Sequence, residues 1–262
     1  MKNKGYLLLQ QLQYRGKCIF NVSEAQSLLK VSRASVMAIL ARLRACNLIV
    51  TLTNGLYAIL EPTEQNHGLR PLRILAPFMK HLKTDYYVGL LSAANHWGAA
   101  HHKPQHLQVM LPKRCFLKRL GKLKMQFLLK KYFSDIGTLT AKAAFGYYKI
   151  SSPELTALDV ISYQKDCGGF SNVCLVIRDL IGEMNEESLR ICTQNYPIMS
   201  SIQRLGYMME KYHAPKKLTI PLKKRLQSQK PSLIPLYSGG KRKGAIHKDW
   251  MIIENTTLEF EE

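Results

Sequence analysis

An amphipathic helix followed directly by two β-prone runs is the pattern that most restricts what this chain can fold into. The segment VSRASVMAILARLRACNLIV carries one apolar helix face, formed by Val36, Ile39, Leu40 and Leu43. Ser32 stands where a helix cap is expected. The runs LIVTLT and LYAIL follow, joined by Asn54-Gly55, a pair that favours the type I′ turn of a hairpin. We therefore expect a helix and a hairpin wing.

The residues before this segment predict two more short helices. One covers Gly5 to Gln13, and the other starts at Ser23, where Ser23 and Gln26 have capping-box spacing. A tight turn between short helices is typical of a helix-turn-helix. Residues 1–62 are thus predicted to form a winged helix-turn-helix DNA-binding domain. The alternative is a small packing unit of the same shape that binds no DNA.

The predicted DNA contacts lie on the third helix and on the wing. Alanines occupy much of the helix side opposite the apolar face, so direct base readout would rest on a few polar residues, and specificity should be modest. The alanines can instead favour helix or allow close packing of another domain. The wing has no Lys or Arg. It is therefore expected to position the protein on the DNA backbone rather than to read base edges. The candidate residues are Ser32, Arg33, Ser35, Ala38, Arg42, Thr53 and Asn54.

Net charge favours nucleic acid as the partner. The 38 Lys and Arg residues outnumber 18 Asp and Glu, giving +20, which attracts polyanions. A dense run forms a second basic surface, which could contact operator DNA or RNA; alternatively it is a solvated strand pair whose lysines protect its edges. This surface comprises Lys113, Arg114, Lys118, Arg119, Lys122 and Lys124. The basic stretch 211–248 is expected to be largely a loop, because of its prolines and Gly239-Gly240.

The remaining pattern predicts a larger α+β domain over residues 86–262, after a linker region at 63–85 that follows Pro62 and contains Pro71 and Pro77. Helices are expected at 86–97, from Pro153 onward, at 173–184 and at 198–212. Strands are expected at 107–111, 122–129, 147–150 and 250–253. The fold class is therefore α+β, with the winged helix first.

Several short motifs follow one another in a recognisable order: LLSAANHWG, QVMLPK, KMQFLLKK, SSPELTALD, GG and a late W-x-I-x-x-N. In this order they resemble the AbiEi-type antitoxins of bacterial abortive-infection, or type IV toxin-antitoxin, systems, which serve in phage defence. The resemblance implies an antitoxin domain that counteracts a separately encoded nucleotidyltransferase toxin, without an obligatory stable complex. It also implies autorepression of the shared operon through operator DNA. It carries over no catalytic residue.

Candidate catalytic and metal-binding residues do not combine into a site. His96, His101, His102 and His106 cluster, but Pro104 breaks any helix that would hold the last two on one face. Carboxylates such as Asp159, Asp166 and Asp179 lack a spacing that specifies a Mg²⁺-dependent nuclease. Asp159 is expected to fix a local backbone group or a basic neighbour. We predict no enzyme, no metal and no cofactor.

Six cysteines without a C-x-x-C pair, and the lack of a secretory signal or long apolar run, predict a reduced cytoplasmic chain without a membrane partner. Two further hypotheses stay open beside the antitoxin. One is a general nucleic-acid-binding protein, for DNA or RNA, that has no toxin partner. The other is a nuclease.

Overall fold

The structure is a computed structural model that describes residues 4–100, 104–114 and 124–258. The chain divides into two compact units. The first unit comprises Met1–Tyr86, Leu111–Leu129 and Ala141–Tyr148, and the second comprises Tyr87–Met110, Lys130–Thr140 and Lys149–Glu262.

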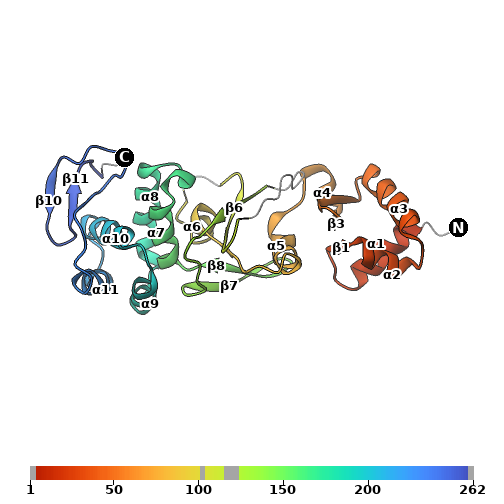
Figure 1. The fold of residues 1–262 in the computed structure, drawn as a ribbon, viewed down its shortest axis with the longest axis horizontal. Coiled ribbons are helices and arrows are strands. Elements are labelled where there is room, and N and C mark those ends of the chain that lie inside the picture. Colours follow the sequence, from red (N-terminus) through yellow and green to blue (C-terminus); the bar gives the residue numbers. More distant parts are fainter. Residues whose placement is uncertain (1–3, 101–103, 115–123, 259–262) are drawn as a thin grey trace. The chain divides into compact units, whose positions relative to one another are not determined.

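The first unit begins with three helices and a three-stranded antiparallel sheet (Figure 1). The elements are α1 (Lys4–Tyr14), β1 (Ile19–Asn21), α2 (Val22–Leu29), α3 (Arg33–Ala45), β2 (Ile49–Thr53) and β3 (Leu56–Ile59). Strand order is β1-β3-β2. The apolar helix faces share one core with the sheet, including Leu8, Phe20, Val36, Leu40 and Tyr57. This element order is that of a winged helix, and the predicted α+β class is confirmed.

Helix α2 begins at Val22, one residue earlier than predicted, and its N-cap is Asn21 rather than Ser23. The side chain of Asn21 accepts a hydrogen bond from the Glu24 amide at 2.9 Å, and the Glu24 carboxylate accepts one from the Asn21 amide at 3.0 Å. Asn21 is the last residue of β1, so the chain turns from strand to helix without a loop. The capping-box spacing was correct in kind, but it applies to Asn21 and Glu24.

Replacing Asn21 with alanine is expected to lower the free energy of unfolding by about 1 kcal/mol, because the Glu24 amide loses its acceptor. Ser23→Ala is the matched control, since Ser23 is exposed and does not cap the helix. Urea denaturation of both variants checks this. Equal losses would contradict the assignment of Asn21 as the cap.

The hairpin turn also differs from the prediction. A type I′ turn needs positive φ at both central residues, whereas of Asn54 and Gly55 only the glycine has one, at 74°. The register shifts between Thr51 and Thr53, so the strand is irregular just before the turn. This irregularity provides local twist that the primed turn would otherwise supply.

The stretch predicted as a linker region contains two helices, α4 (Pro62–His67) and α5 (Pro71–His81). Pro62 and Pro71 stand at the first position of each helix, where the missing amide costs nothing, so prolines that indicated a linker begin helices instead. Buried Arg73 donates to Glu64 at 3.0 Å and to the carbonyl oxygen of Ile59 at 2.5 Å. Burial tends to raise the pKa of Glu64, but hydrogen bonds from Arg73 and the backbone lower it overall. Helix α5 is thereby tied to the end of β3.

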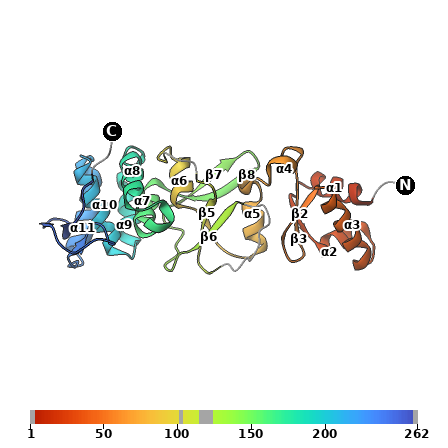
Figure 2. The same cartoon turned by 90° about the horizontal axis from the view of Figure 1, so that it is seen from above.

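The next strands along the chain form a five-stranded mixed sheet (Figure 2). Its strands are β4 (Tyr87–Val88), β5 (Leu107–Leu111), β6 (Met125–Leu129), β7 (Thr138–Ala143) and β8 (Gly146–Ser151), in the order β6-β5-β4-β8-β7. The strands predicted at 107–111 and 147–150 are confirmed. The helix predicted from Tyr86 begins later, as α6 (Leu90–His96), because Tyr87 and Val88 pair with β5 and β8.

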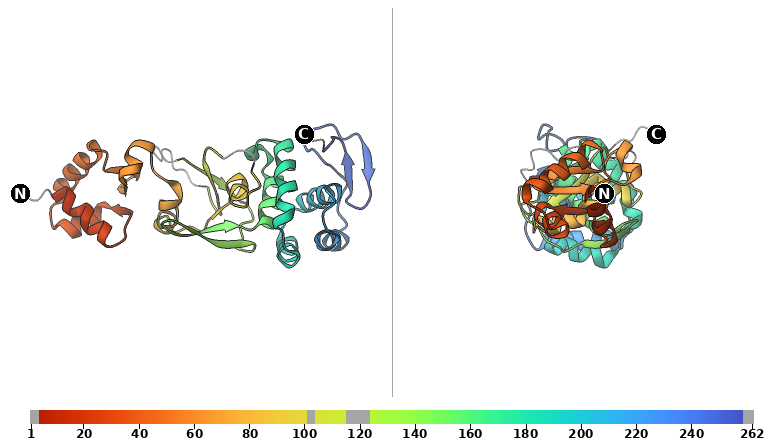
Figure 3. Two further views of the ribbon diagram at one scale, coloured as in Figure 1. Left: turned by 180° about the vertical axis from the view of Figure 1, so that it is seen from behind. Right: turned by 90° about the vertical axis from the view of Figure 1, so that its right-hand side faces the viewer.

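Helices make up most of the second unit's remaining chain. They are α7 (Pro153–Ser162), α8 (Phe170–Leu180), α9 (Glu186–Asn195), α10 (Met199–Lys211) and α11 (Lys216–Gln227), with short 3-10 turns at Gln164–Cys167 and Ile181–Glu183. Three strands, β9 (Ile234–Pro235), β10 (Ala245–His247) and β11 (Ile252–Glu254), form a small sheet, and β11 contacts α10 (Figure 3). The helices predicted from Pro153, at 173–184 and at 198–212 are confirmed within a few residues.

Helix α11 corrects the expectation of a loop in the basic stretch 211–248. Its lysines are interleaved with a stripe of three buried leucines, Leu218, Leu222 and Leu226, spaced four residues apart. That spacing is an amphipathic helix signal, which the charge density and Pro221 concealed.

Candidate nucleic-acid interface

Helix α3 presents the predicted contact residues to solvent. Arg33, Ser35, Ala38 and Arg42 are exposed, while Val36, Ile39, Leu40 and Leu43 are buried in the core of the winged helix. The two faces are separated as the helical periodicity predicts. The structure therefore brings the five predicted helix residues, Ser32 included, to the accessible side of α3.

The polar side chains on this face differ in how many hydrogen bonds they already make within the protein. The hydroxyl of Ser32 accepts a hydrogen bond from the Ser35 amide at 3.2 Å, and the two hydroxyls lie 3.0 Å apart, so Ser32 acts first as a helix cap. Arg42 donates from Nε to the carbonyl oxygen of Ala38 at 3.3 Å, which leaves its terminal nitrogens available. Within the described ranges, neither the Arg33 nor the Arg44 side chain has an ion pair or hydrogen bond, and both are exposed. Of the predicted contact residues on α3, Arg33 is thus the most available cation.

The wing offers weaker candidates. Asn54 is exposed at the turn, whereas Thr53 is half-buried at the end of β2, a strand that contacts α3. Neither residue carries charge, so the hairpin can donate single hydrogen bonds to phosphates but adds no electrostatic attraction.

Met37 is a candidate that sequence reasoning missed. It lies on the exposed side of α3 with 45% of its surface accessible, one turn after Arg33. An apolar side chain there can touch a thymine methyl group in the major groove. A helical wheel could have found it, but a methionine beside Val36 is easily assigned to the core.

The second basic surface is only partly described. Lys113, Arg114 and Lys124 are exposed. Lys118, Arg119 and Lys122 lie outside the described residues, so this surface stays a prediction.

The histidine and carboxylate candidates do not form a metal site among the described residues. His96 and His106 are exposed, and His101 and His102 lie outside the described ranges. The described helices also include none that is long and apolar enough to cross a bilayer.

Asp159 lies at the centre of a buried hydrogen-bonded cluster, which we call the Asp159 cluster. Lys130 Nζ lies 2.8 Å from its carboxylate, and the hydroxyls of Tyr87 and Tyr196 donate to it at 2.7 and 2.9 Å. Burial, followed by the Asp159 charge, raises the pKa of both phenols, so they remain protonated donors. Asp159 is 0% exposed, so no substrate reaches it. Its role matches the expected basic neighbour.

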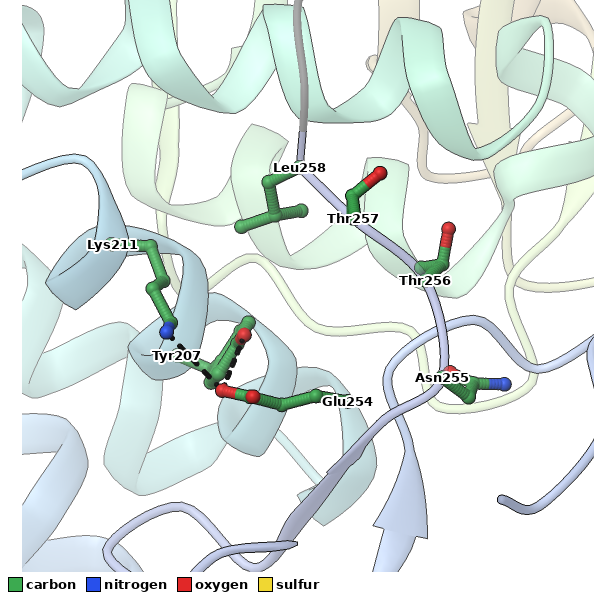
Figure 4. A pocket seen from close by; sticks show the side chains of 7 residues that line it. All are labelled: Tyr207, Lys211, Glu254, Asn255, Thr256, Thr257 and Leu258. Atoms are coloured by element: carbon green, nitrogen blue, oxygen red, sulfur yellow. Dashed lines mark hydrogen bonds and ion pairs between the residues drawn. The ribbon is translucent and has the colours of Figure 1, made fainter. Parts of the chain in front are cut away.

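A pocket of about 500 Å³ lies near the end of the described chain, between α10 and the residues after β11 (Figure 4). Tyr207 donates to Glu254 at 2.8 Å, and Lys211 lies 3.2 Å from the same carboxylate. The hydrogen bond from Tyr207 is the main reason that the pKa of Glu254 is lowered. Both groups converge on one acid and satisfy it, so the cluster ties β11 to α10.

Residues 87–211 match the family model described as the AbiEi antitoxin C-terminal domain. They belong to that family. The AbiEi domain therefore begins at β4 and ends with α10. The crystal structure of the Rv2827c protein from Mycobacterium tuberculosis is also similar, with a TM-score of 0.70 over 96% of this chain and 91% of that chain, at 13% identity. At that identity the similarity concerns the fold. No curated protein sequence matches the chain.

The motifs that indicated the AbiEi domain hold its interior together. Trp97 donates from its indole to the carbonyl oxygen of Ser151 at 2.9 Å. Gln108 accepts from the Leu91 amide at 2.9 Å and donates to the carbonyl oxygen of Asp166 at 2.8 Å. These bonds connect segments distant in sequence, so the motifs are primarily a signature of the fold.

Proposed function

We propose that this chain is a DNA-binding transcriptional autorepressor and antitoxin of a type IV toxin-antitoxin system that serves in phage defence. It acts in the cytoplasm, binds operator DNA upstream of its own operon and counteracts a nucleotidyltransferase toxin. Two findings support this: an AbiEi antitoxin domain at residues 87–211, and a preceding winged helix with an exposed cationic helix face. Repression and antitoxicity then reside in different parts of the chain.

The observation that carries the repressor assignment is the exposed face of α3. Arg33 and Arg42 lie nine residues apart, or two and a half turns, so they lie on different sides of the accessible surface. In a major groove, this arrangement suits one cation for base edges and one for the backbone. Between them Ala38 and Met37 present only apolar atoms. One copy of the winged helix should therefore bind DNA with modest sequence specificity. An operator with two half-sites, bound by two copies, would raise that specificity.

The antitoxin function rests on family membership rather than on a catalytic arrangement. The AbiEi domain counteracts the toxin without an obligatory stable complex, and it uses no metal or cofactor. The buried carboxylate Asp159 is committed to Lys130 and two tyrosines, so it serves the fold.

Operator binding by a double variant tests the repressor assignment. Arg33→Ala/Arg42→Ala is expected to weaken binding roughly 10- to 100-fold at physiological salt, because two of the three arginines of α3 are removed. Antitoxicity, measured as the growth of cells that produce both the toxin and the variant, should remain. Lys80→Ala/Lys142→Ala removes the same charge from exposed positions outside α3 and should change affinity little.

A salt series with a scrambled duplex completes the design, since charge alone gives non-specific binding that salt removes. Operator preference that survives at physiological salt supports a repressor. If operator and scrambled DNA lose binding together, the +20 charge favours a general nucleic-acid-binding protein instead. Unchanged operator affinity in the Arg33→Ala/Arg42→Ala variant would contradict the assignment of α3 as the DNA recognition helix.

A further inference from the structure

A second pocket, of about 410 Å³, lies in the second unit where the end of α7 meets the beginnings of α8 and α10. The segment Tyr237, Ser238 and Gly239 forms another side. This volume is within the range of small-molecule sites. We call it the α8–α10 pocket.

Two helix N-termini open on this pocket, and neither has a side-chain cap or an acid in its first turn. Helix α8 has 11 residues and follows Gly169, whose φ of 90° needs glycine; α10 has 13 residues and follows Ile198. The amides of Phe170 and Ser200 have no backbone acceptor in the described chain. By contrast, α7 and α9 in the same unit have capping side chains and acids in their first turns. The pocket therefore carries unpaired donors and positive helix ends.

Arg204 adds a buried cation with no counter-ion. It is 8% exposed and lines the pocket, one turn after Ser200 on α10. Its Nε donates to Leu236 at 2.9 Å and its Nη2 to Pro235 at 3.0 Å, both through carbonyl oxygens. Within the described residues, its Nη1 has no acceptor and no carboxylate pairs with it. Burial alone lowers its pKa. A buried charge without a counter-ion is costly, so an anion here would stabilise the folded chain.

Other charged groups leave the balance positive. Lys165 and Asp166 also line the pocket and offset each other formally. The hydroxyl of Ser200, half-buried at the second position of α10, makes no hydrogen bond within the described chain and can donate to an oxyanion. Arg204 and the two helix ends remain as net positive features.

An aromatic surface completes the pocket. The rings of Phe170 and Tyr237 lie 5.5 Å apart, and Tyr237 is 38% exposed. Asn255 fixes the backbone of Tyr237, accepting from its amide and donating to its carbonyl oxygen, each at 2.9 Å. A flat ring held in this way offers a stacking face for a base.

We propose that the α8–α10 pocket binds a nucleoside monophosphate, with its phosphate between the two helix N-termini and Arg204 and its base against Tyr237. Phosphate at helix N-termini with an arginine beside it is chemically well matched. The proposal does not depend on DNA binding by α3 or on antitoxicity.

Isothermal titration of the full chain with the four nucleoside monophosphates tests this, at physiological chloride to suppress binding to other basic surfaces. One-to-one binding is expected, tighter than that of inorganic phosphate or ribose 5-phosphate, with none for the unphosphorylated nucleosides. Ribose 5-phosphate binding as tightly as the nucleotides would remove the base from the proposal. A flat titration with every nucleotide would overturn it.

Ser200→Asp separates binding from folding. A carboxylate at the second position of α10 interacts favourably with the helix dipole, so Tm should hold or rise, while the anion is repelled and affinity falls at least about 10-fold. Ser23→Asp makes the same change at the second position of α2, outside the pocket, and should bind as wild type. Arg204→Gln keeps donors for the two carbonyl oxygens but removes the charge, and should also lose binding. Wild-type affinity in Ser200→Asp would overturn the placement of the phosphate at the α10 N-terminus, and wild-type affinity in Arg204→Gln would show that Arg204 serves only to tie the Pro235–Leu236 backbone to α10.

Discussion

Lys130→Met is expected to lower the free energy of unfolding by about 3–5 kcal/mol, because it leaves a buried carboxylate without its counter-ion. Asp159 is 0% exposed and Lys130 is 6% exposed. The ammonium lies 2.8 Å from the carboxylate and 5.1 and 5.2 Å from the ring centroids of Tyr87 and Tyr196. Two tyrosine hydroxyls remain as donors in the variant, but they cannot neutralise the charge. Urea denaturation followed by tryptophan fluorescence measures the loss.

Lys149→Met is the matched control, since it makes the same substitution in an ion pair of the same unit. Lys149 and Asp135 lie 3.3 Å apart, with side chains 41% and 57% exposed, and such pairs contribute below about 1 kcal/mol. The double variant Lys130→Met/Asp159→Leu should recover part of the loss, because it removes both buried charges together. Equal destabilisation by the two methionine variants would contradict the importance of the Asp159 cluster.

The winged helix was predictable because its determinants are local. The apolar stripe of α3, its cap and the turn residues all lie within 28 residues of one another, from Ser32 to Ile59. Errors occurred where two local signals competed: Ser23 against Asn21 for a cap, or prolines that begin α4 and α5 rather than mark a linker.

The interior contacts of the second unit could not be predicted as well from the sequence, because they join residues that are far apart along the chain. Asp159 was expected to meet a basic neighbour, but nothing local identified Lys130, 29 residues earlier, or Tyr87, 72 residues earlier. Likewise, Gly239-Gly240 was predicted as a loop, whereas the position of Gly239 in the same pocket as Arg204 and two helix N-termini depends on how α8, α10 and β9 pack. The exposed residues of α3 could be predicted from the sequence, but the α8–α10 pocket could not.

Gly206→Ala is expected to destabilise the chain by about 3 kcal/mol or more, because no space exists for the added methyl group. A Cβ at position 206 would lie 2.0 Å from Cζ3 of Trp250, which is 0% exposed. The indole cannot move away easily, since its Nε1 donates to Glu210 at 2.8 Å and Lys223 Nζ lies 5.3 Å from the ring centroid. This close approach explains why tryptophan opens the late W-x-I-x-x-N motif: its six-membered ring packs against a glycine of α10.

Gly182→Ala is the control, since a Cβ there meets nothing within 4 Å and its effect should stay within about 1 kcal/mol. Combining Gly206→Ala with Trp250→Leu tests the cause, because the smaller side chain leaves room for the new methyl group. The double variant should lose less stability in urea denaturation than the two single losses added together. Strict additivity would mean that the cost at position 206 comes from the α10 backbone rather than from contact with the indole. Non-additivity would instead establish that α10 and the segment bearing Trp250 pack as one body, the arrangement that also holds Tyr237 through Asn255.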